Sequence, residues 1–265
     1  MPEAEPRALD DLVRENRILE RRLRRLEGDI RQLEEFQDSN ATLLSGLLRD
    51  LEEERAKSQR LLLNVLPQRI IDRLAAGETL IADGHEDVTV LFSDIVGFTT
   101  ISSEMPPSEL VAELNGLFSG FDAICDATGV DKIKTVGDAY LAVGGLAGDG
   151  PAGEVAVADA ALRMIGFAQE RGGPDGWRIR IGIHAGPLVA GVVGSSKFAY
   201  DVWGDTVNIA SRLETTSEPG RIQVSADLAR RLDATFLVER RGMVDLKGKG
   251  SAETYWLVGP RDAPG

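Results

Sequence analysis

Two aspartates, Asp94 and Asp138, carry the clearest chemical signal in the sequence. Asp94 lies in the segment Leu-Phe-Ser-Asp-Ile-Val-Gly-Phe-Thr at 91–99, and Asp138 lies in Lys-Thr-Val-Gly-Asp-Ala-Tyr at 134–140. Each follows a short apolar run, which predicts a carboxylate at the end of a strand, where it could hold a divalent cation over a phosphate. A lone aspartate after a strand is more often a turn or cap residue. Two such runs with their glycines favour nucleotide chemistry.

A third polar cluster lies further along the chain, in the segment Tyr-Asp-Val-Trp-Gly-Asp-Thr-Val-Asn-Ile-Ala-Ser-Arg-Leu-Glu at 200–214. It places Asn208 and Arg212 four positions apart, which puts both side chains on one face of a helix. An amide beside a guanidinium suits a sugar oxygen and a phosphate. Alone, such a pair is more often a surface hydrogen bond. With the two aspartates, it indicates a nucleotide site.

Alternating strand and helix patterns must position these side chains. From Val88 onwards they predict an α+β fold, in which helices cover one side of a sheet. The expected helices are 107–128, 154–170 and 206–217, and the expected strands are 88–92, 130–136, 138–143, 177–184, 221–224, 236–239 and 254–258.

A strict seven-residue repeat precedes this region and predicts a coiled coil. A helix lying on a protein core would drift off this period over such a length. At 1.5 Å per residue, the coil should be about 80 Å long. Its two seam positions hold Leu9, Asn16, Leu23, Ile30, Gln37, Leu44, Leu51 and Ser58, and Leu12, Leu19, Leu26, Leu33, Asn40, Leu47, Glu54 and Leu61.

Polar residues interrupt the seam of the predicted coil. Asn16 occupies the first seam position, where an asparagine usually gives a parallel, two-stranded coil. Gln37 and Asn40 are further polar seam residues, which more often fix the register than act as switches. Glu54 and Ser58 weaken the end of the seam nearest the rest of the chain. We therefore expect a parallel homodimer with one soft end.

A short connector follows the coil. Pro67 disfavours helical geometry at Leu66 and should end the coil. The apolar positions after Pro67 restart a short helix, which Gly77 should close. We therefore expect the segment to form a rigid link between the coil and the α+β region.

Composition narrows the possible partners. The 265 residues are 43% hydrophobic, which suffices for one good-sized domain and an extension. The net charge of -13 argues against nucleic acid or an anionic membrane as a partner, because either would need a basic face. The single cysteine, Cys125, excludes a disulfide framework and is expected to pack as a small hydrophobe. With no membrane-length apolar run and no signal peptide, we expect a cytoplasmic protein.

The motifs together resemble the class III nucleotidyl cyclase catalytic domain. The resemblance rests on five separated blocks, 92–99, 134–140, 180–186, 200–214 and 247–250, and it covers about 88–258. The connector is also similar to the transducing helix-turn of coiled-coil-linked members. The resemblance implies a ferredoxin-like βαββαβ core, with helices on one face of a mostly antiparallel sheet. It divides the chain into a coiled-coil helix (1–62), a connector (63–84), a catalytic domain (85–259) and a flexible tail (260–265).

The resemblance implies a metal site and a reaction. Asp94 and Asp138 match the two metal-holding aspartates of the family, and the Ile95 carbonyl matches a further ligand. Two Mg²⁺ or Mn²⁺ ions per site are expected, one at the ribose 3'-hydroxyl and one at the triphosphate. The 3'-oxygen would attack the α-phosphorus in line and release pyrophosphate, so that catalysis is mainly positioning and charge stabilisation.

Four further residues take their expected roles from the resemblance. Asn208 matches the residue that orients the ribose, and Arg212 matches the residue that stabilises charge on the α-phosphoryl group. Arg180 and Lys247 match residues that grip the outer phosphates. By contrast, His184 is expected to be a packing residue with one hydrogen bond, not a catalytic base.

Lys134 and Asp201 match the family's base-recognition positions. Adenine offers an acceptor at N1 and a donor at N6, whereas guanine reverses both. Lys134 only donates and Asp201 only accepts, so together they fit adenine. The guanylate-forming branch typically has Glu and Cys at these positions. The alternatives are a structural ion pair for Lys134 and a turn for Asp201.

The expected function is therefore that of an adenylate cyclase, a phosphorus-oxygen lyase acting on ATP. The resemblance implies a head-to-tail homodimer, in which Asp94 and Asp138 of one protomer face Lys134, Asp201 and the Asn208–Arg212 pair of the other. An upstream sensor or partner could act through the coil. The alternatives are a guanylate cyclase and a catalytically idle module that relays a signal by dimerising.

Overall fold

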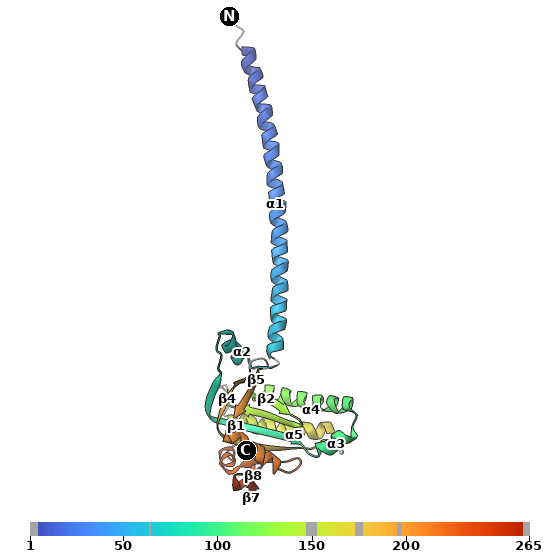
Figure 1. Ribbon diagram of the computed structural model, residues 1–265, viewed down its shortest axis with the longest axis vertical. Coiled ribbons are helices and arrows are strands. Elements are labelled where there is room, and N and C mark those ends of the chain that lie inside the picture. The colour runs from blue at the N-terminus through green and yellow to red at the C-terminus, as the bar shows by residue number, and fades with distance from the viewer. Residues whose placement is uncertain (1–4, 64, 147–152, 173–176, 195–197, 262–265) are drawn as a thin grey trace. The chain divides into compact units, whose positions relative to one another are not determined.

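The heptad region forms one long helix, α1 (Glu5–Leu63), of 59 residues (Figure 1). The computed structural model describes residues 5–63, 65–146, 153–172, 177–194 and 198–261. Residues 1–4 of the predicted coil and 262–265 of the predicted tail therefore lie outside the described residues. None of the helices that the structure describes is long and apolar enough to cross a bilayer. The long N-terminal helix that the repeat predicts is confirmed.

The seam leucines of α1 lie on its surface. Leu12, Leu19, Leu26 and Leu33 are between 54% and 60% exposed in the single chain. An apolar stripe of this kind on a helix is normally covered by another helix. A coiled-coil helix without its partner helix would show this exposure. Pairing of two chains through this seam stays a prediction.

The connector breaks the helix where the sequence places the break. Helix α1 ends at Leu63, and α2 (Gln68–Ala75) begins directly after Pro67. Gly77 has φ of 89°, a left-handed conformation that favours glycine after a helix end. Contacts divide the chain into two units, Met1–Ile71 and Asp72–Gly265.

The second unit contains an eight-stranded sheet with the order β2-β3-β1-β4-β6-β8-β7, and β5 also pairs with β4. All pairs are antiparallel except β4 with β6. The strands are β1 (Ala82–Ile95), β2 (Asp131–Val136), β3 (Ala139–Gly144), β4 (Ile179–Val193), β5 (Ala199–Trp203), β6 (Ile222–Ser225), β7 (Phe236–Leu246) and β8 (Gly250–Pro260). The helices are α3 (Phe98–Glu104), α4 (Pro107–Thr128), α5 (Gly153–Gly172), α6 (Asp205–Thr215) and α7 (Ala226–Leu232).

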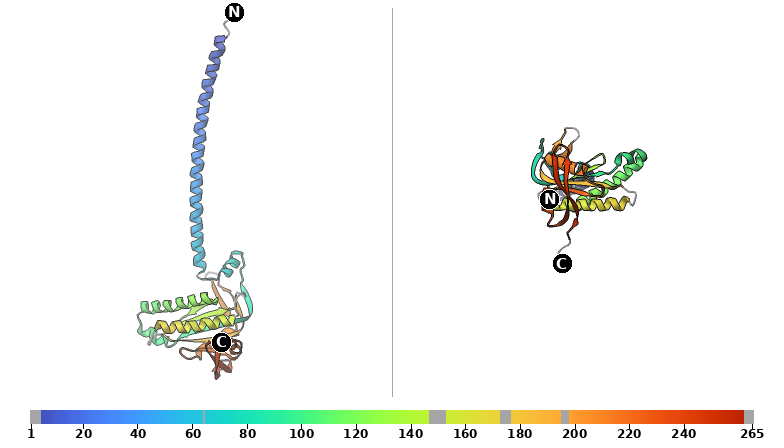
Figure 2. Two further views of the ribbon diagram at one scale, coloured as in Figure 1. Left: turned by 180° about the vertical axis from the view of Figure 1, so that it is seen from behind. Right: turned by 90° about the horizontal axis from the view of Figure 1, so that it is seen from below.

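The first half of this unit is the expected ferredoxin-like core. The chain order β1-α4-β2-β3-α5-β4 gives four neighbouring strands in the order β2-β3-β1-β4. Helices α4 and α5 run side by side (Figures 1 and 2) and share one hydrophobic core with the sheet. Phe121 of α4, Met164 of α5 and Ile181 of β4 are fully buried in that core. The α+β fold with a mostly antiparallel sheet is therefore confirmed.

Three short elements were not predicted: α3, β5 and α7. Several strands are also longer than predicted, because polar residues extend their pairing; β1 pairs with β4 from Ala82 to Ile95. In addition, α6 packs on the face opposite the long helices. Ile181 and Ile183 point into the core of α4 and α5, so the intervening Gly182 points the other way, towards α6. Helices α4 and α5 thus cover one face, as expected, whereas the helix expected at 206–217, α6, packs on the other face because Gly182 lets it approach there.

Candidate active site

Strand pairing brings Asp94 and Asp138 together. Asp94 is the penultimate residue of β1, and Asp138 follows Gly137 in the turn that joins β2 to β3. Because Ser93 of β1 pairs with Tyr140 of β3, the two carboxylates lie at the same end of neighbouring strands. Burial, together with the negative charge of Asp94, raises the pKa of Asp138. A pair of carboxylates that repel each other in this way suits a divalent cation.

The described part of the chain has no group of three or more His, Cys, Asp or Glu side chains that could hold a metal ion. An ion at this pair would therefore need additional oxygen ligands, such as a backbone carbonyl or a phosphate. Ile95 directly follows Asp94, and its side chain is buried in the core. Its backbone carbonyl is the further ligand that the family resemblance implies.

Arg180 lies beside this carboxylate pair and joins three elements. It is the residue of β4 directly opposite Asp94 of β1. Its Nη2 donates to Asp94 Oδ2 at 2.7 Å, and its Nε donates to Glu214 Oε1 on α6, also at 2.7 Å. Its Nη1 donates to the Thr215 carbonyl oxygen at 3.2 Å. The predicted phosphate-binding arginine is therefore paired with a predicted metal ligand.

Glu214 is a residue of this site that the sequence reasoning missed. Its carboxylate is buried, and burial raises its pKa to about 7. Among the described residues, Arg180 is the one cation within ion-pair distance of it. The close approach of β4 to α6 depends on Gly182, because a Cβ there would overlap the backbone of Ala210 and Glu214. A glycine between two core isoleucines was the available signal, since it marks a place where another backbone comes close.

Lys134 and Asp201 form a second group. Lys134 Nζ donates to Asp201 Oδ2 at 2.5 Å, and Asp201 Oδ1 accepts from the Val202 N–H at 2.9 Å. The pairing register of β2 shifts between Lys132 and Lys134, and such irregularities re-aim side chains near functional sites. The structure thus places a donor and an acceptor, which are 67 residues apart in sequence, next to each other.

Helix α6 carries Asn208 and Arg212, with Asn208 exposed and Arg212 half-buried. Its first turn is fixed by Thr206, whose hydroxyl donates to the Pro187 carbonyl oxygen at 2.6 Å. Lys247 is exposed in the turn between β7 and β8. Within the described ranges, no hydrogen bond or ion pair joins the Asp94 group, the Lys134 pair and the two α6 side chains to one another.

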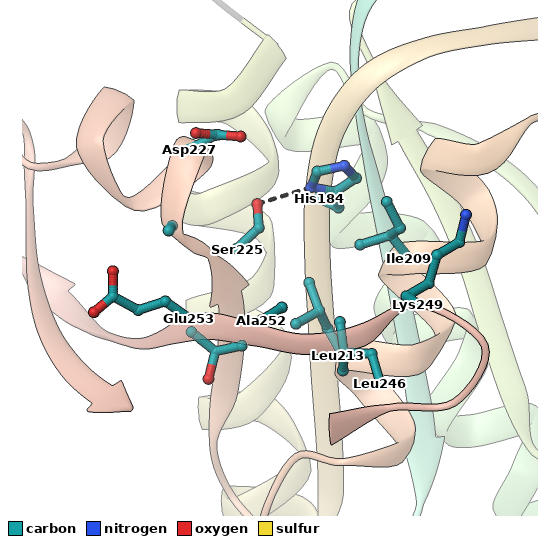
Figure 3. A pocket seen from close by; sticks show the side chains of 11 residues that line it. His184, Ile209, Leu213, Ser225, Asp227, Leu246, Lys249, Ala252 and Glu253 are labelled. Carbon is teal, nitrogen blue, oxygen red and sulfur yellow. Dashed lines mark hydrogen bonds between the residues drawn. The ribbon is translucent and has the colours of Figure 1, made fainter. Parts of the chain in front are cut away.

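His184 lies outside these groups, at a pocket with a volume of about 320 Å³ (Figure 3). Its Nδ1 shares a hydrogen bond with Ser225 Oγ at 2.8 Å, and burial lowers its pKa. Ile209 and Leu213 of α6 line the same pocket, together with Leu246. None of the predicted site residues lines it. One hydrogen bond in a packed setting agrees with the predicted role of His184.

Comparison with known proteins identifies one family. The sequence matches the family described as "Adenylate and Guanylate cyclase catalytic domain" over residues 80–259. A protein of Mycobacterium bovis named adenylate cyclase is 44% identical over 216 residues, which are 80% of this chain and 49% of that protein. Retinal guanylyl cyclase 1 of Mus musculus is 43% identical over 242 residues, which are 88% of this chain and 22% of that protein. The chain therefore spans half or less of the length of these relatives.

A solved structure agrees with this match. The guanylate cyclase domain of RhGC from Catenaria anguillulae, in complex with GTP, is similar with a TM-score of 0.64 and 37% identity. The match covers 68% of this chain and 100% of that one. Because adenylate-forming and guanylate-forming relatives are nearly equally similar to this chain, the base must be argued from individual residues.

Proposed function

The chain belongs to the class III adenylate and guanylate cyclase family, and on that premise we propose that it is an adenylate cyclase. It would convert ATP to 3',5'-cyclic AMP and pyrophosphate by attack of the ribose 3'-oxygen on the α-phosphorus. The pairing of Lys134 with Asp201 is the observation that carries this proposal, because it concerns the base directly.

Lys134 and Asp201 present one donor and one acceptor at a single place. Adenine N1 would accept from Lys134, and the adenine N6 amino group would donate to Asp201. Guanine would bring a donor to the lysine and an acceptor to the aspartate, so neither side chain would have a matching partner on the base. The Val202 N–H occupies Oδ1 of Asp201, so the base would meet Oδ2, the oxygen that accepts from Lys134 in the structure.

The carboxylate pair would hold the metal ions. Asp94, Asp138 and the Ile95 carbonyl would bind two Mg²⁺ or Mn²⁺ ions, which lower the pKa of the ribose 3'-hydroxyl and neutralise the triphosphate. Burial and, after it, the negative charge of Asp94 raise the pKa of Asp138, which supports this assignment because a nearby cation would stabilise both carboxylates.

The remaining residues would orient the substrate and stabilise charge. Asn208 would orient the ribose, and Arg212 would neutralise charge that develops on the α-phosphoryl group. Arg180 and Lys247 would bind the outer phosphates. Asn208 and Arg212 lie four residues apart on α6, so a single rigid helix fixes their spacing.

We further propose that two chains share each site in a head-to-tail homodimer held by the α1 coil. Within one chain, and among the described residues, no hydrogen bond or ion pair joins Asp94 or Asp138 to Asn208 or Arg212 of α6. A second copy would supply Lys134, Asp201, Asn208 and Arg212 opposite Asp94 and Asp138, giving two equivalent sites. The division into coil, connector, catalytic domain and tail belongs to this proposal, as does an upstream partner that acts through the coil.

Guanylate cyclase activity is the second candidate, because the guanylyl cyclase relative is 43% identical. Pyrophosphate release should be measured with ATP and with GTP, each with Mg²⁺ and with Mn²⁺. We expect turnover with ATP, and a Lys134→Glu, Asp201→Cys variant should lose ATP use far more than GTP use. An unchanged ATP to GTP preference in this variant would remove the assignment of these two residues.

Mixing two inactive variants tests the shared site. Asp94→Ala removes a metal ligand, and Asn208→Ala removes the ribose contact. In a mixed dimer, one site carries both lesions and the other carries none. Equal amounts refolded together should recover about one quarter of wild-type activity, because half the dimers are mixed and each has one intact site. If mixing yields only the mean of the parents while subunit exchange is confirmed independently, each chain holds its own complete site.

A further inference from the structure

The three partners of Arg180 differ in how easily each can give it up. Glu214 is buried, with its side chain 8% exposed, and it depends on the guanidinium for its charge. Asp94 is more exposed, at 18%, and already faces a second carboxylate, that of Asp138. The Thr215 carbonyl accepts the longest of the three hydrogen bonds, at 3.2 Å. Breaking the contact with Glu214 leaves a buried charge unpaired, whereas an incoming cation can replace the contact with Asp94.

The two carboxylates also bind different nitrogens of the guanidinium. Glu214 accepts from Nε, and Asp94 accepts from Nη2. The Nη edge can therefore change partner while Nε stays in place. Phosphate oxygens are well suited to this edge, because a guanidinium binds them through paired N–H groups.

Helix α6 is close enough to serve as a fixed anchor. Gly182 of β4, two residues after Arg180, lets the backbone of Glu214 approach the sheet. Glu214 follows Arg212 by two positions, which turns its side chain to roughly the opposite side of the helix. The same helix would thus hold Arg180 through one side and present Arg212 through the other.

We propose that Glu214 is a positioning residue that anchors Arg180 through Nε, so that the Nη groups exchange Asp94 for the substrate's outer phosphates. In the structure, Arg180 is the internal counter-ion of Asp94, and it would compete with a metal ion for that carboxylate. On binding of a metal-bound triphosphate, Asp94 would ligate the cation, and the guanidinium of Arg180 would bind the phosphates. Metal and nucleotide binding are therefore coupled. This inference rests on the proposed function, because it assumes the metal site at Asp94.

Metal binding without nucleotide tests the counter-ion. Free Mn²⁺ can be followed by electron paramagnetic resonance with the full chain, so no turnover is needed. Arg180→Met should tighten Mn²⁺ binding by about tenfold, because Asp94 loses its competing cation. Arg178→Met is the matched control, since Arg178 is an exposed arginine two residues away that makes no ion pair in the described structure. Its Mn²⁺ affinity should stay within about twofold of wild type.

Phosphate binding tests the anchor. Inorganic tripolyphosphate serves as the probe in calorimetry with the full chain. Glu214→Gln, which keeps the shape and removes the charge, should weaken tripolyphosphate binding by roughly tenfold. In the Arg180→Met background the same change should have little effect, because Glu214 acts through Arg180. Circular dichroism and thermal unfolding check that each variant is folded, and Glu214→Asp offers a second variant that keeps the charge.

The outcomes separate this inference from the proposed function. If Asp94→Ala leaves Mn²⁺ binding unchanged, the metal site is wrong and the inference fails with it. If Asp94→Ala abolishes binding while Arg180→Met does not tighten it, the metal site stands and the counter-ion role is overturned. Equal losses of tripolyphosphate affinity from Glu214→Gln with and without Arg180 would overturn the anchor role.

Discussion

Replacing Gly182 with alanine should separate β4 from α6. A Cβ at this position would lie 2.5 Å from the Ala210 carbonyl oxygen and 2.6 Å from Glu214 Cα, and closer still to the Glu214 backbone nitrogen. Ordinary contacts between heavy atoms are about 3.5–4.0 Å. The atoms involved belong to the helix backbone and cannot rotate away. Helix α6 must therefore move by about 1 Å relative to the sheet.

This movement of α6 should lower both the stability and the activity of the protein. Overpacking of this kind typically costs about 1–3 kcal/mol, which should appear as a lower midpoint in urea unfolding. The shift also displaces Asn208 and Arg212, which α6 carries towards the proposed substrate. A misplacement of about 1 Å can lower turnover by roughly 100-fold. We therefore expect Gly182→Ala to lose cyclase activity far beyond what its reduced stability explains, measured at a temperature where it stays folded.

Gly166→Ala is the matched control for this experiment. Gly166 lies in α5, and a Cβ there meets nothing within 4 Å. Alanine in a helix should stabilise the protein by roughly 0.5–1 kcal/mol and leave turnover unchanged. If Gly182→Ala behaves like Gly166→Ala in both assays, the close approach of α6 does not govern the site.

Three further outcomes are expected. Cys125 is 1% exposed, and burial raises its pKa to about 11. Iodoacetamide should therefore modify it only when the protein unfolds, and rapid labelling of the folded protein would contradict this. Burial raises the pKa of Glu214 from 4.5 to about 7, so its contribution to stability is present below pH 4.5 and is lost as the pH rises through 7. Urea unfolding should therefore show the wild type losing up to about 3 kcal/mol relative to Glu214→Gln between pH 4.5 and 8, and parallel curves would refute the assignment. Inserting one residue between Leu61 and Pro67 turns the following chain by about 100° around the helix axis, whereas inserting seven residues nearly restores the original orientation. Cyclase activity should therefore fall with one inserted residue and be largely kept with seven. Equal rates for the two insertions would mean that the coil only links the two chains.

Local signals explain why some elements could be predicted closely. The expected helix 107–128 matches α4 (Pro107–Thr128), because Pro107 occupies the first turn and Gly129, with φ of 73°, ends the helix in the left-handed conformation. Strand β5 has only five residues and depends on pairing with β4, which no local pattern reveals. Tertiary pairing, not propensity, decides such short elements.

The sequence predicts those site residues whose own type and local motif indicate a chemical role. Asp94 and Asp138 could be proposed as metal ligands because each follows an apolar run and because the family pattern includes both. The role of Glu214 could not, because its partner Arg180 lies 34 residues away, and Arg180 in turn reaches Asp94 at a separation of 86 residues. The role of a buried glutamate on a short helix can be inferred only once the fold shows which cation lies beside it.

A comparison within the same unit indicates that the Arg180 cluster is more than a structural joint. Arg231 also binds two carboxylates from different elements, Asp87 at 2.7 Å and Glu154 at 2.8 Å. Glu154 is 17% exposed, but Asp87 is 64% exposed, so that arm of the network lies in water, where ion pairs contribute little. Glu214, by contrast, is desolvated, and apolar residues usually stabilise a buried position as well as an ion pair does. Stability alone therefore does not explain why Arg180 lies between Glu214 and Asp94. The proposed role does, because it requires an arginine that keeps its contact with Glu214 and can exchange its contact with Asp94.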